Sequence, residues 1–394
     1  MNIARLHIHH LRSIQYADIS PKACNVFLGD NGSGKTTVLE AIYLLSRGKS
    51  FRHHQPKYYI THGASSTVIF TKLVSFSHEN SALSPTYQTI AVQKSQDATT
   101  ELRLDGQTLA TQSPLTQLLP TLLLEPVSLA ALEQGSQSRR ELLDWLAFHV
   151  EQNFHGQWLA YQRLLRQRNQ FLKTLAGQRQ ISALHRQEIT AWDNQLAEYA
   201  EQIHALRQDL LMRWQPYFAE QVEVFLPHYA KRLRLRYSAG FDSKTGLATL
   251  LAERLDSDIT LGYTRVGSHR ADIQVMLEQS VSDDTGQAHT HSLPAVDMLS
   301  RGERKLLMMA FRLSQLPLLQ AVGKVPLVLI DDITAELDAQ ALNLLLHGLK
   351  QVQCQLFITS LSTNIVPVLR EIWAQDLSVF HLDHGTVSAS SDDG

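Results

Sequence analysis

The sequence predicts an α/β fold in which the two ends of the chain form one domain and the middle forms an inserted helical arm. Three observations support this prediction. A glycine-rich loop at residues 29–37 stands between a strand-like run and a helix-like run. A second apolar run, residues 328–330, ends in Asp331 and Asp332, close to the other end of the chain. Between them lies a long stretch, residues 139–214, that is almost free of glycine and proline and therefore has helical composition.

The loop at residues 29–37 fits the phosphate-binding spacing G-x-x-x-x-G-K-[ST]. Residues 25–28 predict a buried strand before it and residues 38–45 a helix after it, which is the context that the motif requires. Glycines let backbone N–H groups turn toward an anion, and the helix points its positive end at the same place. We expect an ATP and Mg²⁺ site here, with Lys35 at the phosphates and Thr36 on the metal. The expected binding residues of the loop are Gly29, Asp30, Asn31, Gly32, Ser33, Gly34, Lys35, Thr36 and Thr37.

The acidic pair after residues 328–330 is expected to complete this site. In P-loop enzymes the first carboxylate after such a strand holds Mg²⁺, which assigns that role to Asp331. Asp332 is placed to polarise the attacking water, so Lys35, Asp331 and Asp332 are the predicted catalytic residues. Aspartate stands at position 332 where glutamate is commoner, and its reach is one methylene shorter. We therefore expect a weak ATPase that acts as a switch.

Residues 299–303, Leu-Ser-Arg-Gly-Glu, open a helix about thirty residues before the acidic pair. A Ser-x-Gly step at a helix start in this place is the signature of ABC-type ATPases, where it receives the γ-phosphate bound to the opposite subunit. Ser300 and Gly302 are therefore expected to contact ATP across a homodimer, although an ordinary N-capped helix is an alternative. Residues 335–338 occupy the position of the partner-contacting D-loop. Ser360 stands where many such ATPases carry a switch histidine, which again favours slow hydrolysis.

The other elements follow from periodicity and turn residues. Strands are expected at residues 3–8, 68–74, 102–104 and 259–279, with turns or loops at 75–86, 93–100, 105–106 and 280–292. From Pro294 onward, helices alternate with buried strands at 325–330 and 355–359, and residues 388–394 are expected to be disordered. The predicted domains are residues 1–138 and 259–394, which together form the ATPase head, and residues 139–258, which form the arm.

The arm is predicted to be an antiparallel helical hairpin with a seam of coiled-coil type. Its apolar residues recur at steps of four and three: Trp192, Leu196, Tyr199, Ile203, Leu206 and Leu210. We expect arms about 50 Å long at 1.5 Å per residue, with a reversal at residues 176–178. Pro216 and Pro227 are expected to end the helices. Two ordinary helices of a bundle fit the periodicity equally well.

Composition restricts where nucleic acid can bind. The net charge of −2 gives no overall attraction to DNA, so a DNA-binding surface must be local. Residues 139–236 hold fourteen Lys or Arg and ten Asp or Glu, a local excess of four positive charges. The cluster Lys231, Arg232, Arg234 and Arg236 alternates with leucine, which predicts cations on one strand face for phosphate contacts. Further candidates are Arg139, Arg140, Arg163, Arg166 and Arg168, and a solvated surface is the alternative for any one of them.

Other features point to a cytoplasmic protein. The two cysteines, Cys24 and Cys354, lie in separate apolar runs without metal-binding spacing, which favours reduced thiols. The N-terminus lacks a signal-peptide pattern, and no apolar run approaches the length of a membrane span. The histidines lack the spacing of a zinc site.

Taken together, these motifs resemble the RecF family of bacterial recombination mediators, which are related to the chromosome-maintenance (SMC) ATPases. The matching segments cover nearly the whole chain: residues 11–14, 29–43, 48–52, 139–145, 164–169, 267–272, 299–302, 329–332 and 336–338. The Gln-Arg-Asn element at 167–169 and the Gly-Ser-His-Arg-Ala-Asp element at 267–272 are more specific than the ATPase motifs. One departure lies at residues 122–127, where Leu122 and Val127 replace a glutamine and an acidic residue, while Glu125 and Pro126 remain.

The resemblance implies ATP-dependent dimerisation on DNA and a preference for gaps, where single-stranded and double-stranded DNA meet. It also implies cooperation with RecR and RecO in loading RecA, and roles in gap repair and the SOS response. Two other functions remain open at this point. A transporter ATPase would need membrane partners, and its signature normally follows the phosphate loop without a large insertion. A chromosome-tethering or nuclease-associated ATPase would need a longer coiled coil or a nuclease domain.

Overall fold

The computed structural model describes residues 1–79, 82–126, 130–176, 181–282, 288–332 and 337–390. It divides into two compact units, one made of Met1–Leu129 with Leu319–Gly394 and the other of Ala130–Leu318. The first unit joins both ends of the chain, which confirms that the middle is an insertion. The division differs from the predicted boundaries, because residues 259–318 group with the helical unit and not with the chain ends.

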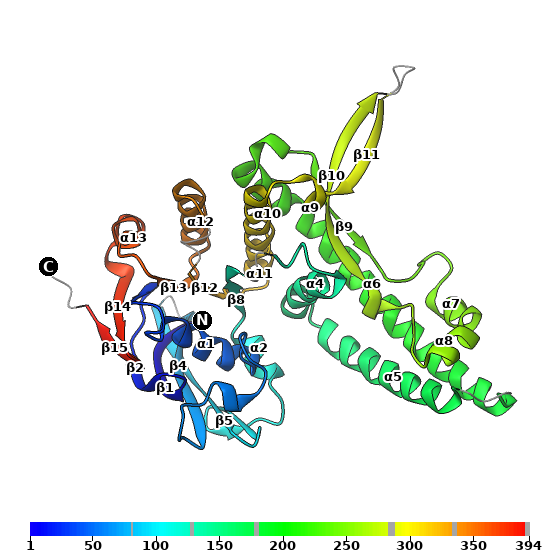
Figure 1. The fold of residues 1–394 in the computed structure, drawn as a ribbon, viewed down its shortest axis with the longest axis horizontal. Coiled ribbons are helices and arrows are strands. Elements are labelled where there is room, and N and C mark those ends of the chain that lie inside the picture. The colour runs from blue at the N-terminus through cyan, green and yellow to red at the C-terminus, as the bar shows by residue number, and fades with distance from the viewer. Residues whose placement is uncertain (80–81, 127–129, 177–180, 283–287, 333–336, 391–394) are drawn as a thin grey trace. The chain divides into compact units, whose positions relative to one another are not determined.

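A mainly parallel sheet forms the centre of the first unit (Figure 1). Its strand order is β15 (Thr386–Ala389), β14 (Leu377–Asp383), β3 (Cys24–Leu28), β13 (Gln355–Ser360), β12 (Leu327–Ile330) and β8 (Thr121–Leu124). All residues of β3, β8, β12 and β13 are buried, as expected for parallel strands covered on both faces. The helices of this unit include α1 (Lys35–Arg47), α2 (Ser113–Leu118), α12 (Ala339–Val352) and α13 (Ile365–Trp373), and α11 (Leu316–Ala321) spans the division.

An antiparallel sheet packs against α1 in the same unit. Its strands are β2 (Ile14–Ile19), β1 (Asn2–Leu11), β4 (Ser66–Glu79), β5 (Ala82–Ser95), β6 (Thr100–Leu104) and β7 (Gln107–Thr108). The predicted strands in this region are present, but the hairpin turn predicted at residues 75–86 is too long: 75–79 and 82–86 are strand, and residues 80 and 81 lie outside the described residues. Strands β4 and β5 remain paired there, from Ser75 with Thr86 to Glu79 with Ala82. Continuous cross-strand pairing outweighs the polar composition that suggested a loop.

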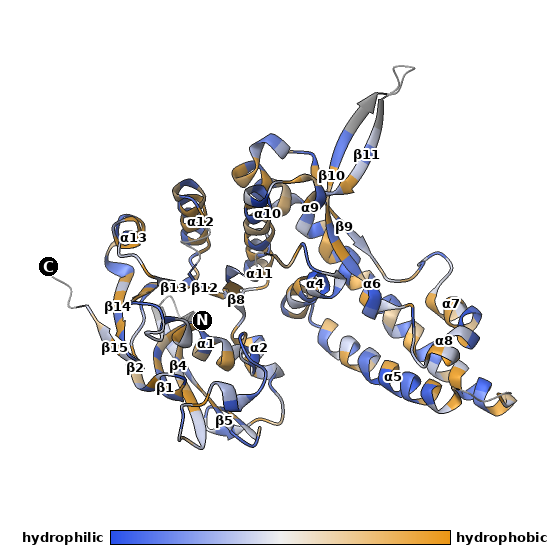
Figure 2. Cartoon of the chain, in the orientation of Figure 1, coloured by the Kyte–Doolittle hydropathy of each residue, from blue (hydrophilic) through white to orange (hydrophobic). Residues whose placement is uncertain are grey.

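Helices dominate the second unit (Figure 1). They are α4 (Ser136–Val150), α5 (Phe154–Leu175), α6 (Ala183–Phe225), α7 (Leu247–Glu253), α8 (Leu255–Leu261), α9 (Ala295–Met298) and α10 (Arg301–Leu313). Helices α5 and α6 form the predicted hairpin, with both hydrophobic and hydrophilic residues along each of them (Figure 2). The arms are unequal, because α5 has 22 residues and α6 has 43, which correspond to about 33 and 65 Å. Residues 177 and 178 of the predicted reversal lie outside the described residues.

The seam of the hairpin is only partly the predicted one. Leu196, Ile203 and Leu210 are fully buried, but the other three residues of the predicted stripe are half-buried. Two charged residues, Asp193 and Arg207, lie on the buried face of α6 instead. The prediction that Pro216 ends the helix is wrong, since α6 continues to Phe225. The buried aromatic side chains Trp214 and Phe218 flank Pro216, and their packing compensates for the lost backbone hydrogen bond.

A three-stranded antiparallel sheet completes the second unit. Its order is β11 (Ala288–Pro294), β10 (Asp272–Ser282) and β9 (Leu233–Ser238). The loop predicted at residues 280–292 is therefore wrong for both flanks, where β10 and β11 pair from Met276 with Pro294 to Ser282 with Ala288. The strand predicted at 259–279 begins only at Asp272. In the C-terminal tail, Ser388 and Ala389 belong to β15 and are not disordered. Among the described residues, no helix combines the length and the apolar character needed to cross a membrane.

Candidate functional site

The phosphate-binding loop connects β3 to α1 and depends on its glycines. Gly29, Gly32 and Gly34 all have positive φ angles, of 153°, 82° and 110°. A Cβ atom at Gly29 would lie 2.3 Å from the carbonyl oxygen of Leu382, so only glycine fits there. Gly34 is the N-cap of α1 and has no side chain to occupy the N–H groups of the first turn. The start of α1, with the positive end of its helix dipole, can therefore receive an anion.

Lys35 is held by the loop that precedes it. Its Nζ atom donates to the carbonyl oxygens of Gly29 at 2.7 Å and Asp30 at 2.9 Å. Burial lowers the pKa of Lys35 from its usual value of 10.5, and the nearby Asp332 and Asp331 oppose that shift. The contacts fix an ammonium group inside the loop, where it can meet a phosphate.

The acidic strand end meets the start of α1 because strands β3, β13 and β12 are parallel neighbours in register. Their carboxyl ends share one edge of the sheet, which is where α/β proteins bind ligands. The Thr36 hydroxyl donates to Asp331 Oδ1 at 2.9 Å. This hydroxyl and carboxylate pair supplies the hard oxygen ligands that Mg²⁺ prefers, so the residues present fit the predicted metal.

Thr359, near the end of β13, links the Asp331 carboxylate to the Asp332 backbone and was missed from the sequence. Its hydroxyl donates to Asp331 Oδ1 at 2.8 Å and accepts from the backbone N–H of Asp332 at 2.9 Å. Asp332 itself has a positive φ of 49°, which the bond to Thr359 helps to hold. The neighbouring Ser360, at the switch-histidine position, accepts from the backbone N–H of Ser362.

A cavity of about 400 Å³ lies above the loop. Its lining residues are Arg12, Ser13, Asn31, Gly32, Gly34, Lys35, Thr36, Thr37, Arg52, Asp332 and Thr359. Most of the predicted loop residues and Asp332 are therefore brought together at one cavity. Of the remaining predicted loop residues, Gly29 and Asp30 hold Lys35, and Ser33 accepts through its carbonyl oxygen from the N–H of Gly385.

Two arginines, Arg12 and Arg52, add positive charge to this cavity, and neither was among the predicted site residues. Arg12 donates from Nη2 to Glu40 Oε1 at 2.8 Å and makes a second contact to the same carboxylate through Nε. The Ser50 hydroxyl also donates to Glu40, which is fully buried in α1. Glu40 thus anchors the two segments that carry Arg12 and Arg52. The pairing was not foreseeable from spacing, because Glu40 lies in an apolar helix pattern.

Glu125 follows β8, beside the acidic strand. The backbone N–H of Asp331 donates to the carbonyl oxygen of Leu124 at 2.9 Å. Burial raises the pKa of Glu125 to about 7, Asp331 adds to that rise, and Arg52 opposes it. Glu125, the displaced acidic residue of the 122–127 segment, is therefore electrostatically coupled to Asp331, the predicted metal ligand. Val127, in the same segment, lies outside the described residues.

Ser300 and Gly302 lie in the second unit, at the start of α10. Ser300 is the N-cap, and its side chain accepts from the N–H of Glu303 at 3.3 Å. The Glu303 carboxylate accepts in return from the N–H of Ser300 at 2.8 Å, which completes a capping box. A Cβ atom at Gly302 would meet nothing within 4 Å. Ser300 and Gly302 are both exposed, as a receptor for a ligand requires. Of the predicted D-loop, residues 335 and 336 lie outside the described residues, and Asp338 caps α12 by accepting from the N–H of Ala341.

The predicted DNA cluster does not form a single strand face. Arg234 and Arg236 lie on β9, where they alternate with the buried Leu233 and Leu235. Arg232 precedes the strand, and Lys231 has a positive φ of 63°, so the chain bends before β9 begins. Lys231, Arg232 and Arg236 are exposed and Arg234 is half-buried. The four cations stay close in sequence, on a corner and the strand that follows it.

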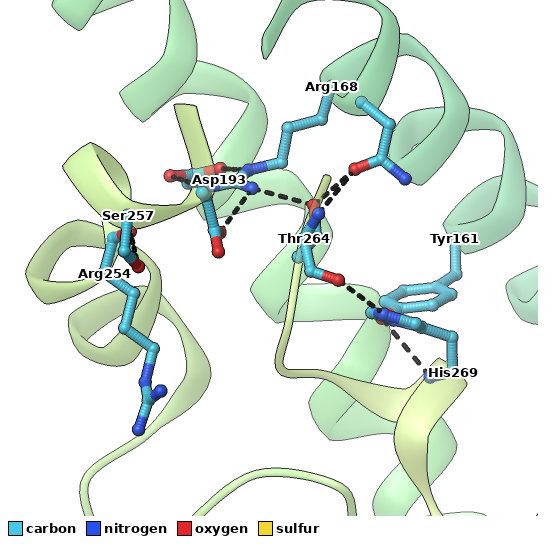
Figure 3. A network of polar contacts seen from close by, with 9 residues as sticks. Tyr161, Arg168, Asp193, Arg254, Ser257, Thr264 and His269 are labelled. Atoms are coloured by element: carbon cyan, nitrogen blue, oxygen red, sulfur yellow. Dashed lines mark hydrogen bonds and ion pairs between the residues drawn. The ribbon is translucent and has the colours of Figure 1, made fainter. Parts of the chain in front are cut away.

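Arg168 cannot contact DNA because it is fully buried. Its guanidinium donates to Asp193, to Asp258 at 2.9 Å and to Thr264 Oγ1 at 2.7 Å (Figure 3). The Asn169 side chain accepts from the Thr264 N–H at 2.8 Å. The Gln-Arg-Asn element thus links α5 to α6, α8 and the segment before η3 (Ser268–Arg270).

The Gly-Ser-His-Arg-Ala-Asp element is also structural. The Tyr161 hydroxyl hydrogen-bonds His269 Nδ1 at 2.7 Å, and Asp272 pairs with Arg139 at 2.8 Å (Figure 3 shows the first contact). Arg140 donates to the carbonyl oxygen of Ala271 at 2.7 Å. Arg139 and Arg140, two of the candidates for DNA contacts, therefore hold the 267–272 segment against α4.

Comparisons with known proteins identify the family of this chain. A sequence model of the family described as "RecF/RecN/SMC N terminal domain" matches residues 2–385. The DNA replication and repair protein RecF of Acinetobacter baylyi is 38% identical over 99% of this chain and 100% of that protein. RecF of Shewanella sediminis is 33% identical over 98% of this chain and 99% of that protein.

Solved structures show the same fold. The recombination mediator protein RecF-ATPrS of the RecFOR pathway matches with a TM-score of 0.78 at 20% identity, over 99% of this chain and 98% of that one. An Smc head bound to the C-winged helix domain of ScpA matches with a TM-score of 0.55 at 14% identity, over 100% of this chain and 98% of that one. The chain belongs to the RecF family of DNA replication and repair proteins.

Proposed function

We propose that this protein is an ATP-dependent DNA-binding protein that dimerises on gapped DNA and, with RecR and RecO, promotes RecA loading in gap repair and SOS induction. The observation that carries the proposal is the meeting of Lys35 and Thr36, at the start of α1, with Asp331, which follows β12. Family membership favours this function over a transporter subunit or a nuclease-associated ATPase.

The proposed nucleotide chemistry is the following. Lys35 and the first-turn N–H groups of α1 bind the phosphates of ATP, and Thr36 and Asp331 hold Mg²⁺, which would neutralise phosphate charge. Asp332 orients water, and its backbone is fixed by Thr359. Because the aspartate carboxylate is short, hydrolysis is slow, and the protein acts as a switch.

The proposed dimer places Ser300 and Gly302 of one copy at the ATP of another. Support comes from the exposed helix start, where the capping box uses the N–H of Glu303 and a Cβ atom at Gly302 would meet nothing within 4 Å. DNA contacts are proposed for Lys231, Arg232, Arg234 and Arg236. Within this unit Arg234 is half-buried and the other three are exposed. Phosphate contacts by these cations make binding salt-dependent and largely independent of sequence.

Light scattering after size exclusion tests the proposal. We expect a dimer with Mg-ATP, stabilised more by gapped duplex than by intact duplex. Lys35→Met removes the phosphate contact and Ser300→Arg blocks the receptor, so both variants are expected to stay monomeric. A protein that remains monomeric with Mg-ATP and gapped DNA contradicts the proposal, as does a Ser300→Arg variant that dimerises normally.

A further inference from the structure

The carboxylate of Glu303, at the start of α10, accepts hydrogen bonds from two partners. Oε2 accepts from the N–H of Ser300 at 2.8 Å, and Oε1 accepts from the Tyr229 hydroxyl at 2.9 Å. The hydrogen bonds from Ser300, and a smaller one from Tyr229, lower the pKa of Glu303, so the carboxylate is charged at neutral pH. The position of Ser300 is therefore fixed by a group that Tyr229 also holds.

Tyr229 belongs to a corner that joins α6 to β9. The corner is the short helix η2 (Pro227–Tyr229), and the N–H of Arg232 donates back to the Tyr229 carbonyl oxygen at 3.0 Å. The Tyr229 side chain is half-buried, so its ring is held by the fold while its hydroxyl reaches Glu303. This corner begins the basic segment, which we define as residues 231–236.

Arg232 places its charge against the same tyrosine. Its guanidinium carbon lies 5.8 Å from the centre of the Tyr229 ring, within the range of a cation–π contact. Nε of Arg232 donates to the Glu278 carbonyl oxygen at 3.2 Å, and the side chain remains exposed. A DNA phosphate that draws this guanidinium toward solvent would alter the charge above the ring that holds Glu303.

We propose that Tyr229 is a positioning residue for Ser300, acting through Glu303, and that it transmits phosphate binding at Arg232 to the start of α10. The inference rests on the proposed function, since it assumes that Ser300 meets ATP and that the basic segment meets DNA. It adds a route between the two sites within one unit: Arg232, Tyr229, Glu303, Ser300.

Tyr229→Phe tests this route, because it keeps the ring and its contact with Arg232 but removes the hydroxyl. The measured quantity is the ratio of the ATP hydrolysis rates with and without saturating gapped DNA, together with the DNA affinity. We expect the ratio to fall about two- to tenfold, the size of effect that one hydrogen bond has on an equilibrium, with unchanged DNA affinity. Arg232→Gln should lower both the ratio and the affinity, and the double variant should show the same ratio as either single variant.

Tyr263→Phe is the matched control, since Tyr263 lies in the same unit and is 41% exposed. Thermal unfolding of both variants separates a loss of folding from a loss of coupling. A partly unfolded variant hydrolyses ATP more slowly both with and without gapped DNA, so the ratio of the two rates stays the same. A ratio in Tyr229→Phe equal to that of the wild type overturns the inference and leaves the proposed function standing. A wild type that neither dimerises with ATP nor responds to DNA overturns both.

Discussion

Replacing Thr359 with valine removes the hydroxyl that joins the Asp331 carboxylate to the Asp332 backbone N–H. Valine has the same shape as threonine, and the site is fully buried, so the change isolates the hydrogen bonds. Asp332 loses the acceptor of its backbone N–H, and Asp331 loses one of two donors to Oδ1. A neutral hydrogen bond contributes about 0.5–1.5 kcal/mol and one to a charged group about 1.5–3 kcal/mol. The expected loss of unfolding free energy is therefore about 2–4 kcal/mol.

Single-turnover hydrolysis of ATP measures the functional consequence. Without Thr359 the Asp332 backbone is less constrained at its positive φ, and a barrier increase of about 1.4–3 kcal/mol slows hydrolysis about 10- to 100-fold. ATP binding should change much less, because the contacts of Lys35 are untouched. Equilibrium unfolding in urea gives the stability of the same variant.

Thr71→Val is the matched control for this experiment. Thr71 is also fully buried in the same unit, but its hydroxyl donates to the Arg5 carbonyl oxygen in the antiparallel sheet. We expect it to lower stability without slowing hydrolysis. If Thr359→Val hydrolyses ATP as fast as Thr71→Val, the argument that Thr359 orders the acidic pair is refuted.

Three further results are expected. Asp332→Glu should speed single-turnover hydrolysis several-fold by restoring the longer reach to water, and an equal or lower rate contradicts the switch argument. Arg168→Met should lower the unfolding free energy by about 3–5 kcal/mol in urea titrations, because two buried carboxylates lose their partner, whereas the exposed Arg166→Met should change it little. Burial lowers the pKa of His269 to about 4, whereas in the unfolded chain it titrates near 6.5. The unfolded state then binds the proton first, so stability falls as the pH drops from about 6.5 to 4, by up to about 3 kcal/mol, and His269→Gln should flatten that part of the pH profile.

The sequence predicted the parts of the site that are local in the chain. The loop at residues 29–37 carries its own spacing and its own strand and helix, so its fold needs no distant information. Thr359 was missed because it reaches the site through strand order and register, which periodicity does not reveal. Arg12 was missed because it reaches the site from the turn between β1 and β2, through its contact with Glu40. The motif containing Arg12 was recognised only as a family resemblance.

Errors in the predicted fold arose where composition and pairing disagree. Polar residues at 75–86 and 280–292 suggested loops, but the described residues of these segments are paired as strands. A solvent-exposed strand can be polar on both faces, so composition alone cannot distinguish it from a turn. The prediction that Pro216 ends the helix was wrong for a related reason. Tertiary packing on both sides of a proline can sustain a helix.

The helical stripe shows what periodicity cannot detect. It identified Leu196, Ile203 and Leu210, but Asp193 and Arg207 share the buried face because each has a partner of opposite charge. A charged residue at a core position breaks the apolar pattern and is interpreted as surface. Only the partners, Arg168 and Asp144, justify its burial, and both lie on other helices.

Residues 259–318 were predicted to belong with the chain ends, and the packing of α10 explains why they group with the helical unit instead. Phe311 on α10 meets Trp214 on α6 with ring centres 4.7 Å apart, and the Trp214 indole N–H donates to Ser314 at 2.7 Å. Both aromatic side chains are fully buried. The helix that Ser300 caps therefore packs into the same core as α6, whereas Lys35 and Asp331 lie in the unit built around the parallel sheet. A force applied to α6 is transmitted through close packing to the helix that Ser300 caps. In the proposed dimer, the two parts of the ATP site would respond to different inputs, with Ser300 following the helical unit and Lys35 following the sheet.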